Sequence, residues 1–519
     1  MSARGGASPR ERPCVKADVA LVAAPSRHRR LDTLAAMLTE RASIFIGGAW
    51  THATGGDRFD AVNPANGEVI ATIARGSRHD VDRAMAAASE AFAGWARRSA
   101  FERAAAMERV AGVIEARRDE LARTLTLDQG KPLMAEAYGE VEELIVYFRM
   151  AAAEATRLDG LMPPSVDANK RVLAYRVPRG VVGVITPWNW PYTMPGELIA
   201  PALAAGNTVV WNPATNTSLC ATVLATCLAD ADLPAGVFNL VTGRGVEIGD
   251  AIAGDPRTAV VGFIGSSEAG MMVAARAVGK DQILEMGGNG PLVILDDADL
   301  DAAVTATLTA AFLNAGQSCT AGERILVQAG VHDDYLERLT IAVHERVRLG
   351  DPMDGATTMG PLNSEAGAAK MDAHVADALA RGARLIAGGQ RAPQHGSPTF
   401  YEATVLDDVD EAMLVAREET FGPIVPLTRI VDVDEALAVV NGSSYGLLTA
   451  IFTSDLGRGL RFAESANAGW VNINEGTNYW ESHLPFGGRA GSASGVGRVG
   501  GRFSMERFTE LKTVILNLG

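Results

Sequence analysis

Residues 316–324 read Gly-Gln-Ser-Cys-Thr-Ala-Gly-Glu-Arg and place one cysteine, Cys319, among small and polar residues. The stretch follows a helix-like run over residues 300–314, so the sulfur is expected at the boundary of an element. Glycines on both sides let the backbone turn tightly and approach a ligand. Backbone N–H groups at such a boundary are free to face a substrate oxygen. The stretch is therefore either a reactive thiol site or a buried structural thiol, because most buried cysteines are inert.

A second stretch favours the reactive alternative. Residues 284–291 read Leu-Glu-Met-Gly-Gly-Asn-Gly-Pro and place Glu285 beside a flexible turn, 34 residues before Cys319. A nucleophile and a base on either side of one helix form a pair suited to covalent catalysis.

These two stretches resemble the signatures of the aldehyde dehydrogenase superfamily. Five further motifs resemble those of the family and occur in its order: ITPWNWP at 185–191, FNLVTG at 238–243, FIGSSEAG at 263–270, EETFGP at 418–423 and PFGG at 485–488. The resemblance runs from about Ile44 to the C-terminus. It implies an α/β fold with a Rossmann-like coenzyme domain, an α/β catalytic domain and a small β arm for oligomerisation. It also implies NAD(P)-dependent oxidation of an aldehyde to a carboxylate, without transfer to coenzyme A.

The periodicity of the chain agrees with this organisation. Apolar residues at three- and four-residue spacing predict helices over 79–97, 101–128 and 132–157. From Gly180 onward, short apolar runs alternate with helical patterns, which indicates a parallel sheet wound with helices. Residues 503–517 are expected to form a final strand. We expect the coenzyme domain at 43–165 and 183–286, the catalytic domain at 287–487, and the oligomerisation arm at 166–182 and 488–519.

Composition and charge limit the classes of partner. The formal net charge of −15 disfavours nucleic acids and anionic membranes, which require basic surfaces. No apolar run reaches the ~18 residues of a transmembrane helix. The four cysteines, at 14, 220, 227 and 319, form no CxxC pair and no cluster with histidine, so neither a metal site nor a disulfide scaffold is expected. A reactive thiol is suited to a reducing compartment, and a cytoplasmic location is expected.

The N-terminal segment differs from the rest. Residues 1–31 carry seven basic residues against two acidic ones, are rich in Ala, Ser and Pro, and lack sustained periodicity. We expect residues 1–42 to be a disordered basic tail. An Arg-rich, acid-poor organelle transit peptide is the alternative.

The resemblance implies roles for three catalytic residues. Cys319 matches the nucleophile, which forms a thiohemiacetal and then a thioester; cysteine suits both steps because it is nucleophilic and a good leaving group. Glu285 matches the general base that activates water for thioester hydrolysis. Asn189 matches the side chain that, with the backbone N–H of Cys319, stabilises the oxyanion.

The resemblance also implies contacts to NAD or NADP. Ser266 ends a strand and opens a helix, the geometry in which a helix N-terminus holds a phosphate. Glu419 and Phe421 match contacts on the nicotinamide side. The expected coenzyme residues are Ile185, Thr186, Trp188, Asn212, Thr215, Gly243, Gly245, Phe263, Gly265, Ser266, Gly287, Glu419 and Phe421.

Two positions depart from the family pattern at the adenine ribose. Asn212 replaces the usual lysine and Thr215 the usual glutamate. The first change removes an attraction for the 2′-phosphate of NADP and the second removes a repulsion, so we expect both coenzymes to be used.

The substrate residues are expected to be Trp190, Glu197, Ser318, Thr320, Trp480 and Phe486. Glu197 stands where the family often has an aromatic residue, and this makes the tunnel more acidic. Dicarboxylic semialdehydes, which require cationic anchors, are therefore disfavoured.

A catalytically silent family member with a structural or binding role is the alternative function. The joint presence of Cys319, Glu285 and Asn189 argues against it. The expected partners are a small-molecule aldehyde and, by resemblance, further copies of the chain in a homodimer or homotetramer.

Overall fold

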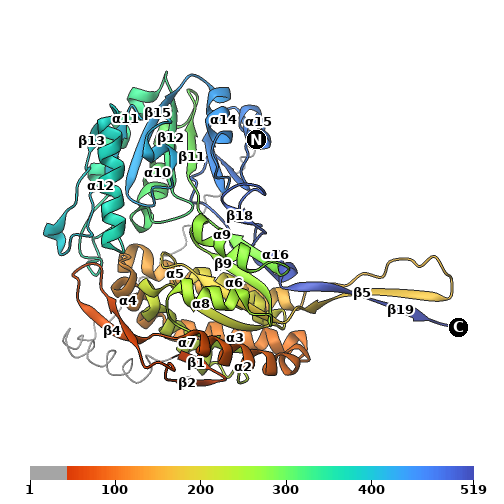
Figure 1. Ribbon diagram of the computed structural model, residues 1–519. Helices are drawn as coiled ribbons and strands as arrows, with labels where there is room; N and C mark the ends of the chain where they lie inside the picture. Colours follow the sequence, from red (N-terminus) through yellow and green to blue (C-terminus); the bar gives the residue numbers. More distant parts are fainter. Residues whose placement is uncertain (1–43) are drawn as a thin grey trace, which may run out of the picture.

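The computed structural model describes residues 44–519. The expected tail at 1–42 lies outside the described residues. Within the described part, the chain forms two α/β units and a projecting β ribbon (Figure 1).

An eight-stranded sheet is the centre of the first unit. Its strand order is β18 (Gly495–Val496), β10 (Asp281–Glu285), β9 (Thr258–Ile264), β6 (Val181–Thr186), β7 (Thr208–Pro213), β8 (Phe238–Leu240), β1 (Ile44–Ile46) and β2 (Ala49–Thr51). The five strands from β10 to β8 are parallel. All six residues of β6 are buried, as expected for a parallel strand covered on both faces. Strands β6, β7 and β8 progress toward one edge and β9 and β10 toward the other, so the strand order reverses between β6 and β9.

Helices cover both faces of this sheet. Side chains of α2, α8 and α9 pack on one face, and those of α3, α5, α6 and α7 form the large core on the other. The helices of this unit are α2 (Arg78–Ala96), α3 (Ala100–Ala116), α4 (Arg118–Gln129), η1 (Leu133–Ala137), α5 (Tyr138–Ala155), α6 (Thr193–Ala204), η2 (Thr215–Thr217), α7 (Ser218–Asp230), α8 (Gly245–Gly254), α9 (Ser267–Arg276) and α16 (Gly501–Arg507). Strands β3 (Arg58–Val62) and β4 (Val69–Ala74) form a separate antiparallel pair.

A seven-stranded sheet is the centre of the second unit. Its order is β13 (Arg384–Ala387), β14 (Thr404–Asp407), β15 (Ile424–Ile430), β12 (Gly322–Gln328), β11 (Gly290–Ile294), β16 (Leu448–Phe452) and β17 (Trp470–Ile473). Only β13 is antiparallel to its neighbour among these strands. Successive residues of β11 point to opposite faces: Leu292 and Ile294 enter one core cluster and Val293 enters another.

Those two clusters contain the helices of the second unit. Helices α10, α11 and α12 pack on one face, and α14 and α15 on the other. The bounds are α10 (Leu300–Phe312), η3 (Leu313–Gly316), α11 (His332–Arg346), α12 (Glu365–Ala380), η4 (Pro393–His395), α13 (Leu414–Arg417), α14 (Val433–Asn441) and α15 (Leu456–Ser465).

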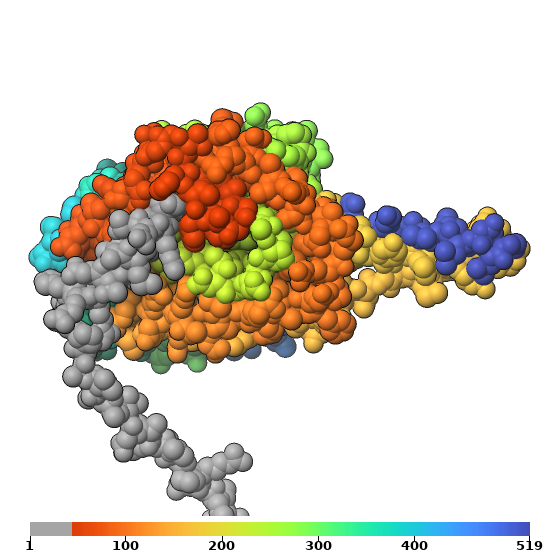
Figure 2. Space-filling view, turned by 90° about the horizontal axis from the view of Figure 1, so that it is seen from below, coloured from red at the N-terminus to blue at the C-terminus, as the bar shows by residue number. Residues whose placement is uncertain are grey.

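A two-stranded antiparallel ribbon projects from the first unit (Figure 1 and Figure 2). It consists of β5 (Lys170–Pro178) and β19 (Thr509–Asn517), which pair along nine residues each. Part of the expected arm lies against the body instead: residues 181 and 182 belong to β6, and β18 pairs with β10.

The α/β class expected from the sequence is confirmed. Two expected elements were wrong in detail. The helix expected over 101–128 is two helices, because the backbone at Arg117 leaves helical geometry between them. The strand expected over 503–517 begins only at Thr509, because the preceding residues form α16, which starts after Gly500 in the left-handed region at φ 101°. Among residues 44–519, no helix is both long and apolar enough to cross a membrane.

Candidate active site

Cys319 lies in a tight turn between α10 and β12. Three consecutive residues before it adopt the left-handed region: Asn314 (φ 53°), Ala315 (φ 52°) and Gly316 (φ 72°). A Cβ on Gly316 would lie 2.2 Å from the carbonyl oxygen of Gly422, so only glycine fits there. The turn stores backbone strain, as is frequent at functional sites, and leaves Cys319 half-buried at the pocket.

Glu285 is the last residue of β10 and faces Cys319. Burial raises the pKa of Glu285 to about 8, and contact with the thiol opposes part of that rise. Burial and the charge of Glu285 raise the pKa of the Cys319 thiol well above its ordinary value. Glu285 Oε1 has no hydrogen-bond partner among the described residues. The carboxyl can therefore accept a proton from the thiol or from a water molecule.

Asn189 lies in the loop between β6 and α6, which brings it from the first unit to the cysteine turn. Its Nδ2 donates a hydrogen bond to the carbonyl oxygen of Gln317 at 3.1 Å, which uses one of its two protons. The backbone N–H of Cys319 makes no hydrogen bond among the described residues. Two donors thus remain for an oxygen bound beside the sulfur.

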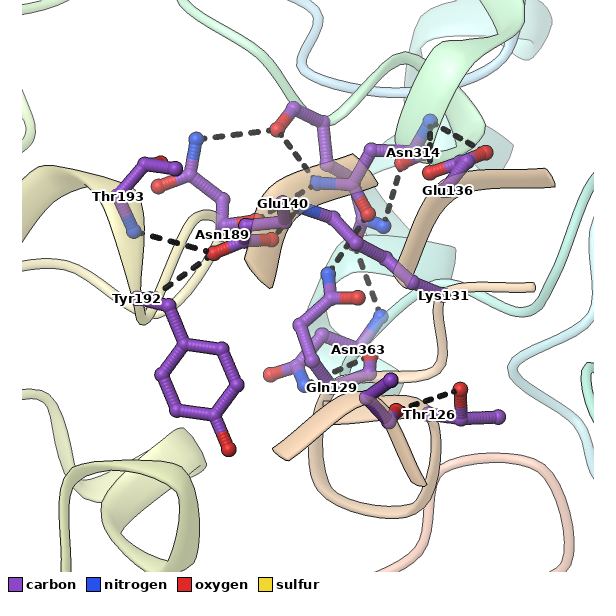
Figure 3. A network of polar contacts seen from close by, with 12 residues as sticks. Thr126, Gln129, Lys131, Glu136, Glu140, Asn189, Tyr192, Thr193, Asn314 and Asn363 are labelled. Carbon is purple, nitrogen blue, oxygen red and sulfur yellow. Dashed lines mark hydrogen bonds and ion pairs between the residues drawn. The ribbon is translucent and has the colours of Figure 1, made fainter. Parts of the chain in front are cut away.

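A buried polar network holds these loops together (Figure 3). Asn314 is at its centre. Its Nδ2 donates to the carbonyl oxygens of Asn189 (2.9 Å) and Gln317 (3.1 Å), its Oδ1 accepts from Gln129 Nε2 (2.8 Å), and its backbone N–H donates to the Glu136 carboxyl (3.0 Å to Oε2). The strained turn is therefore fixed to helices of the first unit.

The same network fixes the start of α6. Glu140, on α5, pairs with the buried Lys131 and accepts hydrogen bonds from the backbone N–H groups of Tyr192 (2.9 Å) and Thr193 (3.4 Å) (Figure 3). The Lys131 ammonium group also lies 3.3 Å from the centre of the Trp190 ring. Helix α6 carries Glu197, so this pairing sets the position of that side chain.

A pocket with an empty volume of about 540 Å³ opens over Cys319 and Glu285. The six residues expected to contact substrate all line it: Trp190, Glu197, Ser318, Thr320, Trp480 and Phe486. The remaining lining residues were not anticipated: Tyr147, Thr193, Met194, Ile264, Leu313 and Asn478. Tyr147 lies within the regular apolar pattern of α5, which gives no sign that its ring faces a pocket, whereas Thr193 and Met194 directly follow a quoted motif.

The residues expected to bind the coenzyme gather at the carboxyl ends of the parallel strands of the first sheet. Ile185 and Thr186 end β6, Asn212 lies near the end of β7, and Ser266 follows β9 as the N-cap of α9. Strand order reverses between β6 and β9, and dinucleotides bind at such switch points. Gly243 and Gly245 flank the start of α8 nearby, and Thr215 begins η2 after β7.

Individual side chains in this crevice fit a dinucleotide to different degrees. Asn212 is buried; its Nδ2 is bonded to the carbonyl oxygens of Val241 (3.0 Å) and Gly243 (3.3 Å), while its Oδ1 has no partner among the described residues. The side chains of Ile185 and Phe263 belong to a buried apolar cluster, so only their backbone is available to a ligand. The orphaned amide oxygen of Asn212 beside Gly249 fits a hydrogen-bond donor such as a hydroxyl group, and the exposed N-terminus of α9 fits an anionic group.

Glu419 and Phe421 face this crevice from the second unit. Glu419 Oε1 accepts a hydrogen bond from the backbone N–H of Gly288 at 2.8 Å, and a Cβ on Gly287 would lie 2.9 Å from the same carboxyl. The ring of Phe421 meets the ring of Trp188 edge-on at 5.7 Å between centres. Side chains from both units therefore meet between the dinucleotide crevice and Cys319. No group of three or more metal-ligating side chains occurs in residues 44–519.

The model of the aldehyde dehydrogenase family matches residues 50–514. The chain belongs to this family. It is an NAD(P)-dependent oxidoreductase that oxidises an aldehyde to a carboxylate.

Characterised relatives are similar over nearly the whole chain. The 3-sulfolactaldehyde dehydrogenase of Pseudomonas putida is 40% identical over 474 residues, which cover 91% of this chain and 96% of that protein. The NADP(+) succinate-semialdehyde dehydrogenase of Escherichia coli is 38% identical over 92% of this chain and 98% of its own length. The structure of betaine aldehyde dehydrogenase from Staphylococcus aureus in complex with NAD+ is 33% identical, with a TM-score of 0.89 over 94% of this chain and 96% of that one.

Proposed function

We propose that Cys319, Glu285 and Asn189 carry out the aldehyde oxidation. The observation that supports this most directly is that Cys319 and Glu285 face one another at one pocket, with Glu285 Oε1 unpartnered. The aldehyde binds with its carbonyl carbon at Cys319 Sγ. Glu285 accepts the thiol proton, and the thiolate forms a C–S bond to that carbon.

The resulting alkoxide oxygen accepts hydrogen bonds from Asn189 Nδ2 and the backbone N–H of Cys319. Donors fixed before the reaction stabilise such an oxyanion, and removal of one typically costs about 10²–10³ in rate. When bound, NAD or NADP supplies a hydride acceptor, which turns the thiohemiacetal into a thioester. The strained turn and its network keep the sulfur aligned with both donors.

Hydrolysis of the thioester completes the reaction. Glu285, after releasing its first proton to solvent, removes a proton from water, and the hydroxide adds to the thioester carbon. Cleavage of the C–S bond releases the carboxylic acid and returns the thiolate.

We propose that the coenzyme binds to the unit formed by residues 43–165 and 183–286, against Ile185, Thr186, Trp188, Asn212, Thr215, Gly243, Gly245, Phe263, Gly265, Ser266 and Gly287. Glu419 and Phe421 would reach it from the catalytic unit, residues 287–487. The projecting ribbon and its exposed apolar residues support a homodimer or homotetramer.

Replacement of the nucleophile tests the assignment. Cys319→Ala should lower kcat by at least about 10⁴-fold, because the covalent step is lost, while binding of NAD measured by calorimetry stays within about twofold. Cys227→Ala, a buried helical cysteine outside the pocket, is the matched control and should keep its activity. A Cys319→Ala enzyme that turns over within tenfold of wild type would refute the assignment.

A further inference from the structure

Aromatic rings form much of the wall of the substrate pocket. Trp480 lies between Tyr147, at 6.2 Å between ring centres, and Phe486, at 5.8 Å. Trp190 adds a fourth ring to the lining. Such a wall binds apolar chains, and the faces of the rings also attract cations.

Besides Glu285, a second carboxyl group lines this pocket and has an oxygen without a hydrogen-bond partner. Glu197, on α6, is 6% exposed, and its Oε1 makes no hydrogen bond to any described residue. The hydroxyl of Tyr147, its neighbour in the pocket wall, forms no hydrogen bond of ordinary length and angle, although its proximity opposes part of the rise in the pKa of Glu197. A buried carboxyl oxygen without a hydrogen-bond partner is costly, so stability does not explain why a glutamate stands at this position.

The charges around Glu197 are negative. Burial, followed by the charges of Glu285 and Glu143, raises the pKa of Glu197 well above its ordinary value. Among the described residues that line the pocket, none is lysine or arginine. The nearby ammonium group of Lys131 is not part of the lining, and it pairs with Glu140 beside the ring of Trp190. An anionic substrate would meet no counter-charge here, whereas a cation bound beside Glu197 would lower its pKa again and pair with the ionised carboxylate.

We infer that Glu197 selects an aldehyde that carries a positively charged amine or ammonium group, which pairs with the Glu197 carboxyl and lies against the aromatic wall. This inference rests on the proposed function, because it places the carbonyl at Cys319 and the cation at Glu197 in the same pocket. The Glu197 Oε1 gains the partner that it lacks. The relatives named for succinate semialdehyde act on an aldehyde with a carboxylate, so this chain should differ from them in the charge of its substrate.

Three aldehydes of similar length test the inference on the full chain with saturating NAD or NADP. They are 3-aminopropanal, which is cationic at pH 7; butanal, its neutral isostere; and succinate semialdehyde, which is anionic. The readout is the ratio of kcat/KM between 3-aminopropanal and butanal. We expect a ratio of about ten or more in wild type, because a charge-assisted hydrogen bond in a dry site is worth at least that factor.

Glu197→Gln keeps the shape of the side chain and removes its charge, so the ratio should fall to about one. Glu142→Gln, an exposed carboxyl outside the lining, is the matched control and should leave the ratio unchanged. A wild-type ratio of one or less, a higher kcat/KM for succinate semialdehyde than for 3-aminopropanal, or a ratio kept in Glu197→Gln would overturn the inference. The wild-type ratio decides even if the variant does not fold. If wild type oxidises butanal but shows a kcat/KM ratio of one or less for 3-aminopropanal over butanal, only the cationic substrate class is rejected. Full activity of Cys319→Ala would instead reject the proposed function itself.

Discussion

Glu285 combines two properties that seldom occur together: it ends a strand inside the protein, and one of its carboxyl oxygens has no partner among the described residues. Its pKa of about 8 means that a minority of the carboxyls are ionised at pH 7. A general base works best when its pKa lies near the working pH, so burial tunes this group for its proposed task.

The rate of thioester hydrolysis should therefore rise with pH and level off above about pH 8. Stopped-flow measurement of acyl-enzyme decay between pH 6 and 9.5 tests this, and Glu285→Gln should lower the rate by about 10²-fold and remove the pH dependence.

The native state holds this proton more tightly than the unfolded chain, whose carboxyl titrates near 4.5, so ionisation destabilises the fold as pH rises from about 4.5 to 8. Glu285→Gln should remove that loss of thermal stability as well; an unchanged pH profile in the variant would show that another group is the base.

Coenzyme choice is also expected to depend on single residues. Thr215 is half-buried at the start of η2, beside the end of β7 where Asn212 lies. The Nδ2 of Asn212 is used by the turn at Val241 and Gly243, so this side chain offers no donor to a 2′-phosphate.

We expect wild type to use NAD and NADP with less than about tenfold preference, equivalent to ~1.4 kcal/mol. Thr215→Glu should shift the ratio of kcat/KM toward NAD by at least about tenfold, because its carboxylate repels the 2′-phosphate. Thr215→Gln, which has the same length without the charge, is the control. A thousandfold preference in wild type would show that residues outside this turn determine the choice.

At the scale of elements, the sequence predicted most helices and strands of the coenzyme unit because their apolar periods are regular. The lining of the pocket shows what such periodicity does not predict. Six lining residues were predicted, but Thr193, Met194 and Ile264 were missed although they lie in or beside quoted motifs. Tyr147 reaches the pocket from α5, and only the packing of α5 against α6 brings it there. The network around Asn314 joins η1, α4 and two loops that are distant in sequence, and no local pattern records such contacts.

The strained turn depends on that network. Asn314→Ala would remove the side-chain bonds to Asn189, Gln317 and Gln129, and would place alanine at φ 53°, where asparagine is better tolerated. We expect the free energy of unfolding to fall by about 2–4 kcal/mol and kcat/KM to fall more than coenzyme affinity. Asn216→Ala, on an exposed side chain with one hydrogen bond, should change stability by less than about 0.5 kcal/mol. Denaturant unfolding and steady-state kinetics provide both measurements, and similar effects of the two substitutions would exclude a positioning role for Asn314.

At the scale of the whole molecule, the ribbon of β5 and β19 is the part that a single chain does not explain. Two-stranded ribbons are marginally stable in water, and this one extends away from the body (Figure 1). Within residues 44–519, β19 pairs with β5 alone, which leaves its other edge free. Apolar side chains are exposed along it, including Leu511 at 52% and Ile515 at 62%. A free edge with exposed apolar residues favours pairing with another chain.

Ile515→Glu should therefore dissociate the proposed oligomer. The side chain is already exposed in the single chain, so the substitution has little to disrupt within it, but a charge buried against a partner subunit would cost several kcal/mol. Light scattering coupled to size-exclusion chromatography should find wild type at two or four times the mass of one chain, and the variant at a lower multiple with the same circular dichroism. Leu460→Glu makes the corresponding change at an exposed leucine on α15, remote from the ribbon, and should leave the mass unchanged. If wild type runs as a single chain, or if Ile515→Glu keeps the full assembly, then the ribbon does not hold subunits together.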